Sequence, residues 1–152
     1  MPTHSEHRPM PYTPQQMFDL VADIAKYPEF LPWCTGARIR SERETEAGKV
    51  VEADLIISFK LFRERFTSRV TMHPESHKIE VEYLDGPFKY LINYWHFLPA
   101  ENGCIADFHV DFEFKSKVLQ GIIGVVFGEA MRRIVKAFED RALALYGPEQ
   151  QA

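Results

Sequence analysis

The sequence predicts an α+β fold in which a curved antiparallel sheet wraps around a long carboxy-terminal helix. Three observations support this expectation. A short helical pattern opens the chain, apolar and polar residues alternate over residues 37–116, and helical spacing returns over residues 116–146. The 152 residues match the length of one average domain, so we expect residues 1–152 to form a single domain.

Composition excludes several classes of protein. Hydrophobic residues make up 45% of the chain and charged residues 26%, which is typical of a globular domain and not of a disordered one. The formal net charge of −4 provides no overall positive field, so we expect no DNA partner. Aromatic residues are frequent, at 12 Phe, 6 Tyr and 2 Trp, and their bulk must fill a core or line a cavity.

The chain is expected to be cytoplasmic, with peripheral contact to the inner membrane as a further expectation. Its first residues contain no apolar segment of the kind found in signal peptides. The longest apolar run, residues 118–127, has about half of the roughly 20 residues that a membrane-spanning helix needs. Cys34 and Cys104 match no zinc spacing and are expected to be reduced and buried.

The first helix is predicted to begin at Pro14 and to end near Tyr27. Thr13 can cap it, and Gln16 can complete a capping box. Pro28 disfavours helical geometry in the residue before it, which predicts the end of the helix. The apolar face consists of Met17, Leu20, Val21 and Ile24.

The central region predicts six antiparallel strands, or seven if the amino-terminal segment adds an edge strand. Such alternation gives a sheet one apolar face and one solvated face. Turn residues at 46–48, 74–76, 85–87 and 101–103 separate the strands. The clearest apolar row is Ala106, Phe108, Val110, Phe112 and Phe114.

The carboxy-terminal helix is predicted to run from a cap at Ser116 to Tyr146. Its length of about 45 Å is enough to cross a whole sheet. A twisted sheet that curls around such a helix encloses a cavity, and the inward Phe, Leu and Ile positions make that cavity apolar. Gly121, Gly124 and Gly128 either allow close packing on a neighbour or provide a pliant gate over the cavity.

The sequence offers no pattern typical of catalysis, and we expect a binding protein that is not an enzyme. It contains no GxSxG nucleophile motif and no glycine-rich phosphate loop. The six histidines lack metal-binding spacing, so neither a metal site nor catalytic residues are predicted. Cys34 has no neighbouring cation in sequence that would activate a thiolate.

Several motifs resemble the coenzyme Q-binding START-domain family. The segment YPEFLPWC at residues 27–34 is similar to the signature near the start of that family. The patterns FxxFxExFTSxV at residues 59–70, WxFxP at 95–99 and DFEFxS at 111–116 follow in the family's order. The resemblance covers residues 12–141 and implies the helix-grip fold of START and pollen-allergen proteins.

The resemblance also implies a function. Members of the family bind ubiquinone or a related polyprenyl lipid and support respiratory electron transport, with ubiquinone as a bound ligand and not as a catalytic cofactor. The mitochondrial members carry a transit peptide, which we do not expect in this chain, so it resembles a bacterial member. Two alternatives stay open. One is a RatA-like ribosome-association inhibitor that binds the large ribosomal subunit, and the other is a polyketide cyclase or dehydratase.

The ligand is expected to contact apolar residues of the strands, the last helix and the signature loop. The predicted contacts are Phe30, Leu31, Trp33, Leu55, Phe59, Tyr83, Trp95, Phe108, Phe112, Ile123, Phe127 and Met131. Trp33 either plugs the end of the core or lines the entrance of the pocket. Asn93, Tyr94 or Tyr83 can offer a hydrogen bond to a quinone carbonyl.

Transient contact with a membrane surface is predicted for the first half of the last helix. Its apolar arc extends beyond one core-facing stripe, through Val118, Ile122, Val125 and Phe127. Arg132, Arg133 and Lys136 follow, and these cations can meet lipid phosphates or ribosomal RNA.

Overall fold

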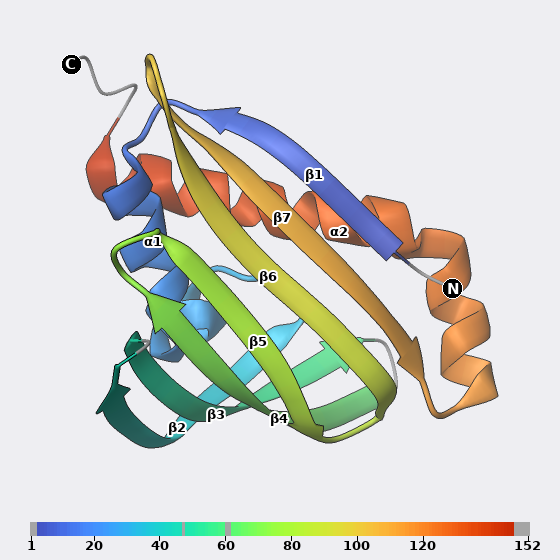
Figure 1. The fold of residues 1–152 in the computed structure, drawn as a ribbon. Helices are drawn as coiled ribbons and strands as arrows, with labels where there is room; N and C mark the ends of the chain where they lie inside the picture. The colour runs from blue at the N-terminus through green and yellow to red at the C-terminus, as the bar shows by residue number, and fades with distance from the viewer. Residues whose placement is uncertain (1–2, 47, 60–61, 148–152) are drawn as a thin grey trace.

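Seven antiparallel strands form one sheet in the order β1-β7-β6-β5-β4-β3-β2 (Figure 1). The computed structural model describes residues 3–46, 48–59 and 62–147, without the side chains of Phe59, Phe62 and Val126. The strands are β1 (Thr3–Met10), β2 (Cys34–Thr45), β3 (Gly48–Phe59), β4 (Phe62–His73), β5 (Lys78–Asp85), β6 (Phe88–Ala100) and β7 (Gly103–Phe114). The helices are α1 (Pro14–Ala22), the 3-10 helix η1 (Ile24–Glu29) and α2 (Lys117–Tyr146).

The predicted α+β class is confirmed, and the amino-terminal segment supplies the seventh strand. β1 pairs with β7 from Thr3 opposite Asp111 to Met10 opposite Cys104. The alternation predicted for β7 is confirmed: buried and partly exposed residues alternate along most of the strand. α2 begins after the predicted cap, since the Ser116 hydroxyl accepts a hydrogen bond from the Leu119 amide.

The first helix begins as predicted but ends earlier. The Thr13 hydroxyl accepts from the Gln16 amide at 3.1 Å, and the Gln16 side chain accepts from the Thr13 amide at 2.9 Å, which completes the capping box. The predicted end near Tyr27 is wrong. The α-helix stops at Ala22, because Asp23 takes a non-helical conformation and its amide bonds three residues back; η1 then contains Pro28.

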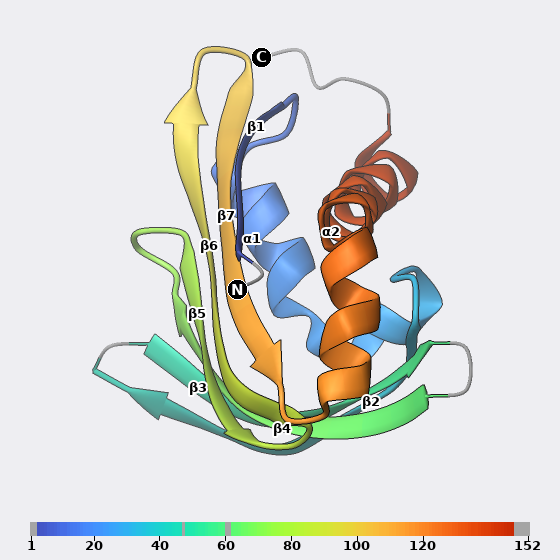
Figure 2. The ribbon, with the colours of Figure 1, turned by 90° about the vertical axis from the view of Figure 1, so that its right-hand side faces the viewer.

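The sheet bends around α2, as Figure 2 shows. β2, β3 and β4 form a floor, β5, β6 and β7 rise from it as a wall, and α2 runs along the open side. Irregularities in register lie in β2, β4 and β6, and bulges of this kind increase local bend and twist. The concave face is therefore directed at the helix.

β5 and β6 are paired over only part of their length. The described register ends at Glu82 opposite Ile92, and beyond this point the Phe88 amide donates to the Tyr83 hydroxyl at 3.0 Å. The Phe88 ring also stacks on Phe114, with centroids 4.8 Å apart. Side chains thus replace ladder hydrogen bonds at this end of the sheet.

The close-packed part of the core lies where α1, β6 and α2 meet. Phe97, Met17, Val21, Val135 and Ala142 are fully buried there. None of the described helices is both long enough and apolar enough to cross a membrane.

Candidate functional site

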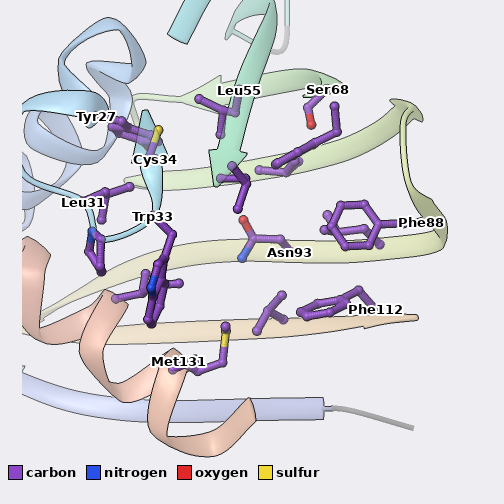
Figure 3. A pocket seen from close by; sticks show the side chains of 18 of the residues that line it. Tyr27, Leu31, Trp33, Cys34, Leu55, Ser68, Phe88, Asn93, Phe112 and Met131 are labelled. Atoms are coloured by element: carbon purple, nitrogen blue, oxygen red, sulfur yellow. The ribbon is translucent and has the colours of Figure 1, made fainter. Parts of the chain in front are cut away.

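A cavity of about 450 Å³ lies between the concave face of the sheet and α2 (Figure 3). This volume is typical of sites for small organic ligands. Its wall includes inward-facing side chains of β3 to β7, the η1 region with the loop after it, and α2 from Leu119 to Phe138. Apolar side chains form nearly all of the wall, and the polar side chains in it belong to Ser68, Asn93 and a few residues of the rim.

Most of the predicted contact residues line this cavity. They are Leu31, Trp33, Leu55, Trp95, Phe108, Phe112, Ile123 and Met131. They come from three separate parts of the chain, which the bend of the sheet brings together. Whether they contact a ligand stays a prediction.

Two other predicted residues lie beside the cavity and not in its wall. Phe30 packs on Phe138 with centroids 5.3 Å apart, and the Arg141 guanidinium lies 5.1 Å from the centre of its ring. Tyr83 lies where β5 and β6 part, with its hydroxyl bonded to the Phe88 amide. Neither ring forms part of the wall because each is already packed against other side chains.

Phe127 also lies outside the wall, on the side of α2 that faces β1 and β7. Its ring contacts Phe112, with centroids 5.2 Å apart, and the ring of His4 on β1, with centroids 6.5 Å apart. The side chain of Phe59, the remaining predicted contact, lies outside the described part of the chain.

The wall contains residues that the sequence prediction did not name. Leu91 and Val110 share the inward alternation of their strands with named residues, so periodicity could have identified them. Val21 and Ile24 belong to the predicted apolar face of the first helix, so helical spacing indicated that they face inward, whereas Tyr27 lies in η1, where no simple period applies.

One of the three predicted hydrogen-bonding residues reaches the cavity. Asn93 lies in its wall, and its side-chain amide donates to the His109 carbonyl at 2.9 Å. Tyr94 follows it in β6, on the opposite face of the sheet, and stacks on the His109 ring with centroids 5.3 Å apart. The Tyr83 hydroxyl already accepts the Phe88 amide hydrogen.

Trp33 lines the cavity in an unusual backbone conformation. Its φ angle is 65°, a left-handed value that bulky residues rarely adopt. The Trp33 carbonyl accepts a hydrogen bond from the Ser58 amide at 2.8 Å, which ties this loop to the end of β3. Such conformations cost energy and persist where the surroundings fix them, often at ligand sites.

Both cysteines are unpaired by disulfide bonds and buried. Cys34 lines the cavity, and burial raises the pKa of its thiol. Burial also raises the pKa of the Cys104 thiol to about 11. Both thiols are therefore protonated near neutral pH, which agrees with their predicted role as buried, reduced side chains.

The predicted cationic surface of α2 is largely neutralised by acids of the same helix. Arg132 and Arg133 lie 3.1 Å and 3.4 Å from carboxylate oxygens of Glu129, and Lys136 lies 3.1 Å from Asp140. The hydrogen bond from Arg132, with the charges of both arginines, lowers the pKa of Glu129. This segment presents little unpaired positive charge for phosphates to bind.

The glycines in the first half of α2 do not serve close packing. A methyl group built at Gly121 or Gly124 would meet nothing within 4 Å among the described residues. Val118 and Val125 lie on the solvent side of the same stretch, with 66% and 86% of their surfaces exposed. The close-packing interpretation is therefore wrong for these two glycines, and the gate interpretation stays a prediction.

Alanine at both Gly121 and Gly124 is expected to stabilise the protein. Alanine favours a helix by about 0.8–1.0 kcal/mol over glycine at each position, so the free energy of unfolding should rise by about 1–2 kcal/mol in urea denaturation. Gly86→Ala provides the opposite control, because φ there is +146° and a Cβ would lie 2.5 Å from the Phe66 Cβ. Destabilisation of the double variant would contradict the open space seen around α2.

Comparison with known proteins identifies relatives along nearly the whole chain. Residues 10–139 match the family described as polyketide cyclase / dehydrase and lipid transport. A ribosome association toxin RatA from Rickettsia prowazekii is 40% identical over 136 residues, covering 88% of this chain and 90% of the relative. The mitochondrial coenzyme Q-binding protein COQ10 homolog B from Xenopus laevis is 33% identical over 152 residues, covering 97% of this chain and 60% of the relative.

Solved structures confirm the predicted helix-grip fold. An 18 kDa protein from Caulobacter crescentus superposes with a TM-score of 0.80 at 37% identity, covering 97% of this chain and 99% of that one. A START superfamily protein from Mycobacterium smegmatis has a TM-score of 0.79 at 19% identity, covering 94% of this chain and 98% of that one, which shows the fold alone. The sequence match and the fold agree, and the chain belongs to the polyketide cyclase / dehydrase and lipid transport family.

Proposed function

We propose that the chain binds a polyprenyl lipid of the ubiquinone class in its cavity and carries it without changing it chemically. The observation that supports this is the cavity of about 450 Å³ with an almost wholly apolar wall. Burying a hydrocarbon tail there contributes about 0.8 kcal/mol per methylene group. A ligand with an apolar body and a small polar head matches this distribution of side chains.

Two groups at the cavity, Glu129 and Tyr27, are not suited to act as general acids. Glu129, at the rim, is kept ionised by Arg132 and Arg133, which lower its pKa, so it holds no proton to donate near neutral pH. Burial raises the pKa of the Tyr27 phenol, and its hydroxyl donates to the Val21 carbonyl. Neither group is poised to transfer a proton to a ligand.

Mass spectrometry of the purified protein tests ligand binding. Protein prepared without detergent from a quinone-producing host should release ubiquinone or another isoprenoid on organic extraction, at no more than about one molecule per chain. Added short-chain ubiquinone should also quench tryptophan fluorescence, because Trp33 and Trp95 line the cavity. The absence of both signals would refute the proposal.

A pair of variants on α2 distinguishes the cavity from the rest of the helix. Ile123→Trp adds bulk at the wall and should lower affinity for short-chain ubiquinone strongly. Leu143→Trp, on the same helix at a half-exposed position outside the wall, should bind as the unmodified chain does. Equal affinities for the two variants would place the ligand outside the cavity.

Association with the ribosome is a second candidate function, and the comparisons support it over quinone delivery as the cellular role. The RatA relative and this chain cover each other almost completely, whereas this chain spans 60% of the coenzyme Q-binding relative. The cavity and the convex face of the sheet are separate surfaces, so a ligand in the cavity would be compatible with either role. The expected target is the large ribosomal subunit.

An exposed cluster of three arginines on the convex face supports this second candidate. Arg38 projects outward from β2, and Arg63 and Arg65 project outward from β4. No acidic group of the described residues lies within ion-pair distance of any of the three. An outward surface with exposed guanidinium groups that form no close ion pair suits the phosphates of RNA, and the charge of Arg65 also acts on Asp54.

Sedimentation with ribosomal subunits tests this surface. The triple variant, with Arg38, Arg63 and Arg65 changed to alanine, should co-sediment less with large subunits, and its binding should depend less on salt. The slope of the logarithm of the binding constant against the logarithm of the salt concentration should become shallower by roughly one unit for each phosphate that the variant no longer binds. Arg132→Ala with Arg133→Ala is the control, since those arginines are paired with Glu129. Unchanged binding of the triple variant would rule out the convex surface.

A further inference from the structure

Ser68 places a hydroxyl group in the apolar cavity without a partner for it. The residue is 5% exposed, and no described residue lies within hydrogen-bond distance of its Oγ atom. It faces inward because it alternates along β4 with Phe66 and Val70, which also line the cavity. Buried hydroxyls in native proteins nearly always have a partner, and one left unpaired lowers stability. This position therefore indicates that a ligand supplies the partner.

Asn93 presents its carbonyl oxygen to the same space. Its Nδ2 atom donates to the His109 carbonyl at 2.9 Å, and a carbonyl can only accept, which fixes the orientation of the side-chain amide. The Oδ1 atom is consequently directed away from β7 and into the cavity, and no described residue donates to it (Figure 3). Ser68 points into the cavity from the neighbouring part of the floor.

The two groups make different demands on a ligand. A serine hydroxyl can donate or accept, so Ser68 can bond to a carbonyl oxygen or to a hydroxyl. The Asn93 oxygen can only accept, so it needs a donor. Ser68 and Asn93 lie two strands apart, with Cα atoms about 12 Å from each other along the sheet, so two ligand oxygens rather than one meet them.

From this arrangement we propose that the cavity selects a head group carrying a hydroxyl, and that it binds a hydroquinone in preference to the corresponding quinone. The inference rests on the proposed lipid-binding function and specifies the form of the ligand. A hydroquinone hydroxyl can donate to the Asn93 oxygen while a second ring oxygen bonds to Ser68. A quinone offers only acceptors, so its carbonyl would face the Asn93 oxygen with no proton between them.

Rotation of the Asn93 amide does not remove this selectivity. Turning the NH₂ group toward a quinone would break the 2.9 Å bond to His109 and place the Oδ1 atom against the His109 carbonyl. Two acceptors would again face each other, now within the protein. The quinone thus loses a hydrogen bond in either orientation.

Anaerobic calorimetry with three probes tests the inference on the full chain. The probes are a short-chain ubiquinone, its hydroquinone and the dimethyl ether of that hydroquinone, which has no donor. The hydroquinone should bind roughly tenfold tighter than the other two, because each of them would cover the Asn93 oxygen without offering it a donor. Equal affinities, or tighter binding of the quinone, would overturn the inference while leaving lipid binding intact. Failure of all three probes, and of the hydrocarbon squalene, would overturn the proposed function and this inference with it.

Two variants assign the selectivity to its residues. Asn93→Leu keeps a similar volume and should abolish the preference, with quinone affinity retained within about threefold. Ser68→Ala should weaken both redox forms by a similar factor and raise the melting temperature of the ligand-free protein, because an unpaired buried hydroxyl is removed. Thr71→Ala, on the outward face of the same strand, should leave the affinities for all three probes unchanged. A preference that persists in Asn93→Leu would refute the assignment.

Discussion

Replacing Phe97 by alanine is expected to lower the free energy of unfolding by about 3–5 kcal/mol. The Phe97 side chain is 0% exposed and stacks on Trp95, with ring centroids 5.7 Å apart. It belongs to the close-packed part of the core, where neighbouring side chains cannot move into the space left by a missing ring. Urea denaturation measures this loss, and an unchanged m-value would show that the substitution alters stability alone.

Leu55→Ala is the matched comparison, because Leu55 lines the cavity. Its side chain already borders open space, so its removal enlarges an existing void and breaks fewer contacts. The loss should fall clearly below the 2–5 kcal/mol typical of a leucine in a packed core. A loss as large as that of Phe97→Ala would show that the cavity is filled by the protein itself.

The second large effect is expected for Arg40→Met, at about 1–3 kcal/mol near pH 7. Asp54 is 3% exposed on the outer face of β3, and Arg40 Nε donates to its carboxylate at 2.8 Å. Burial acts to raise the pKa of Asp54, but hydrogen bonds from Thr67 and Arg40, with the charges of Arg40 and Arg65, bring that pKa below its ordinary value. Methionine covers the carboxylate without neutralising it, so the buried charge loses its main partner.

The effect of Arg40→Met should depend on pH in a defined direction. A carboxyl group whose pKa is lower in the folded state stabilises the fold above its unfolded pKa, and this contribution is lost as the pH falls through the folded value. The stability difference between the two proteins should therefore shrink on acidification and vanish once Asp54 is protonated in both. Lys49→Met, which removes an exposed pair with Glu42, should change stability by less than about 1 kcal/mol. A difference that is constant with pH would contradict the assigned role of Asp54.

The strands and the long helix were predictable because their signals are local. Alternation along β7 and the cap at Ser116 depend on residues close together in the chain, and both are present in the structure. The extent of α1 was not predictable from Pro28, because a 3-10 helix accommodates this proline after the α-helix has already ended at Ala22.

The division of the apolar residues between core and cavity depends on the bend of the sheet, which no local pattern records. Phe112 and Phe127 are both buried aromatic residues in contact with each other, yet only Phe112 belongs to the cavity wall. No sequence pattern indicated that Ser68 lies in the cavity wall, because serine is common in strands with alternating apolar and polar residues. Asp54 lies on the face of the sheet that alternation predicts to be solvated, but the side chains of Arg40 and Thr67 cover it.

The two halves of α2 rest on different supports. Val135 and Ala142 anchor its second half in the close-packed core, whereas Leu119 and Ile122 of its first half face the cavity. A bound ligand would supply the missing support, so amide hydrogens in the first half should exchange more slowly when the cavity is occupied. Because Val118 and Val125 lie on the outside of that same half, a ligand inside the protein would alter the rigidity of a surface that a partner can reach. The helix would thereby make a difference between the ligand-free and the ligand-bound protein detectable at the exterior.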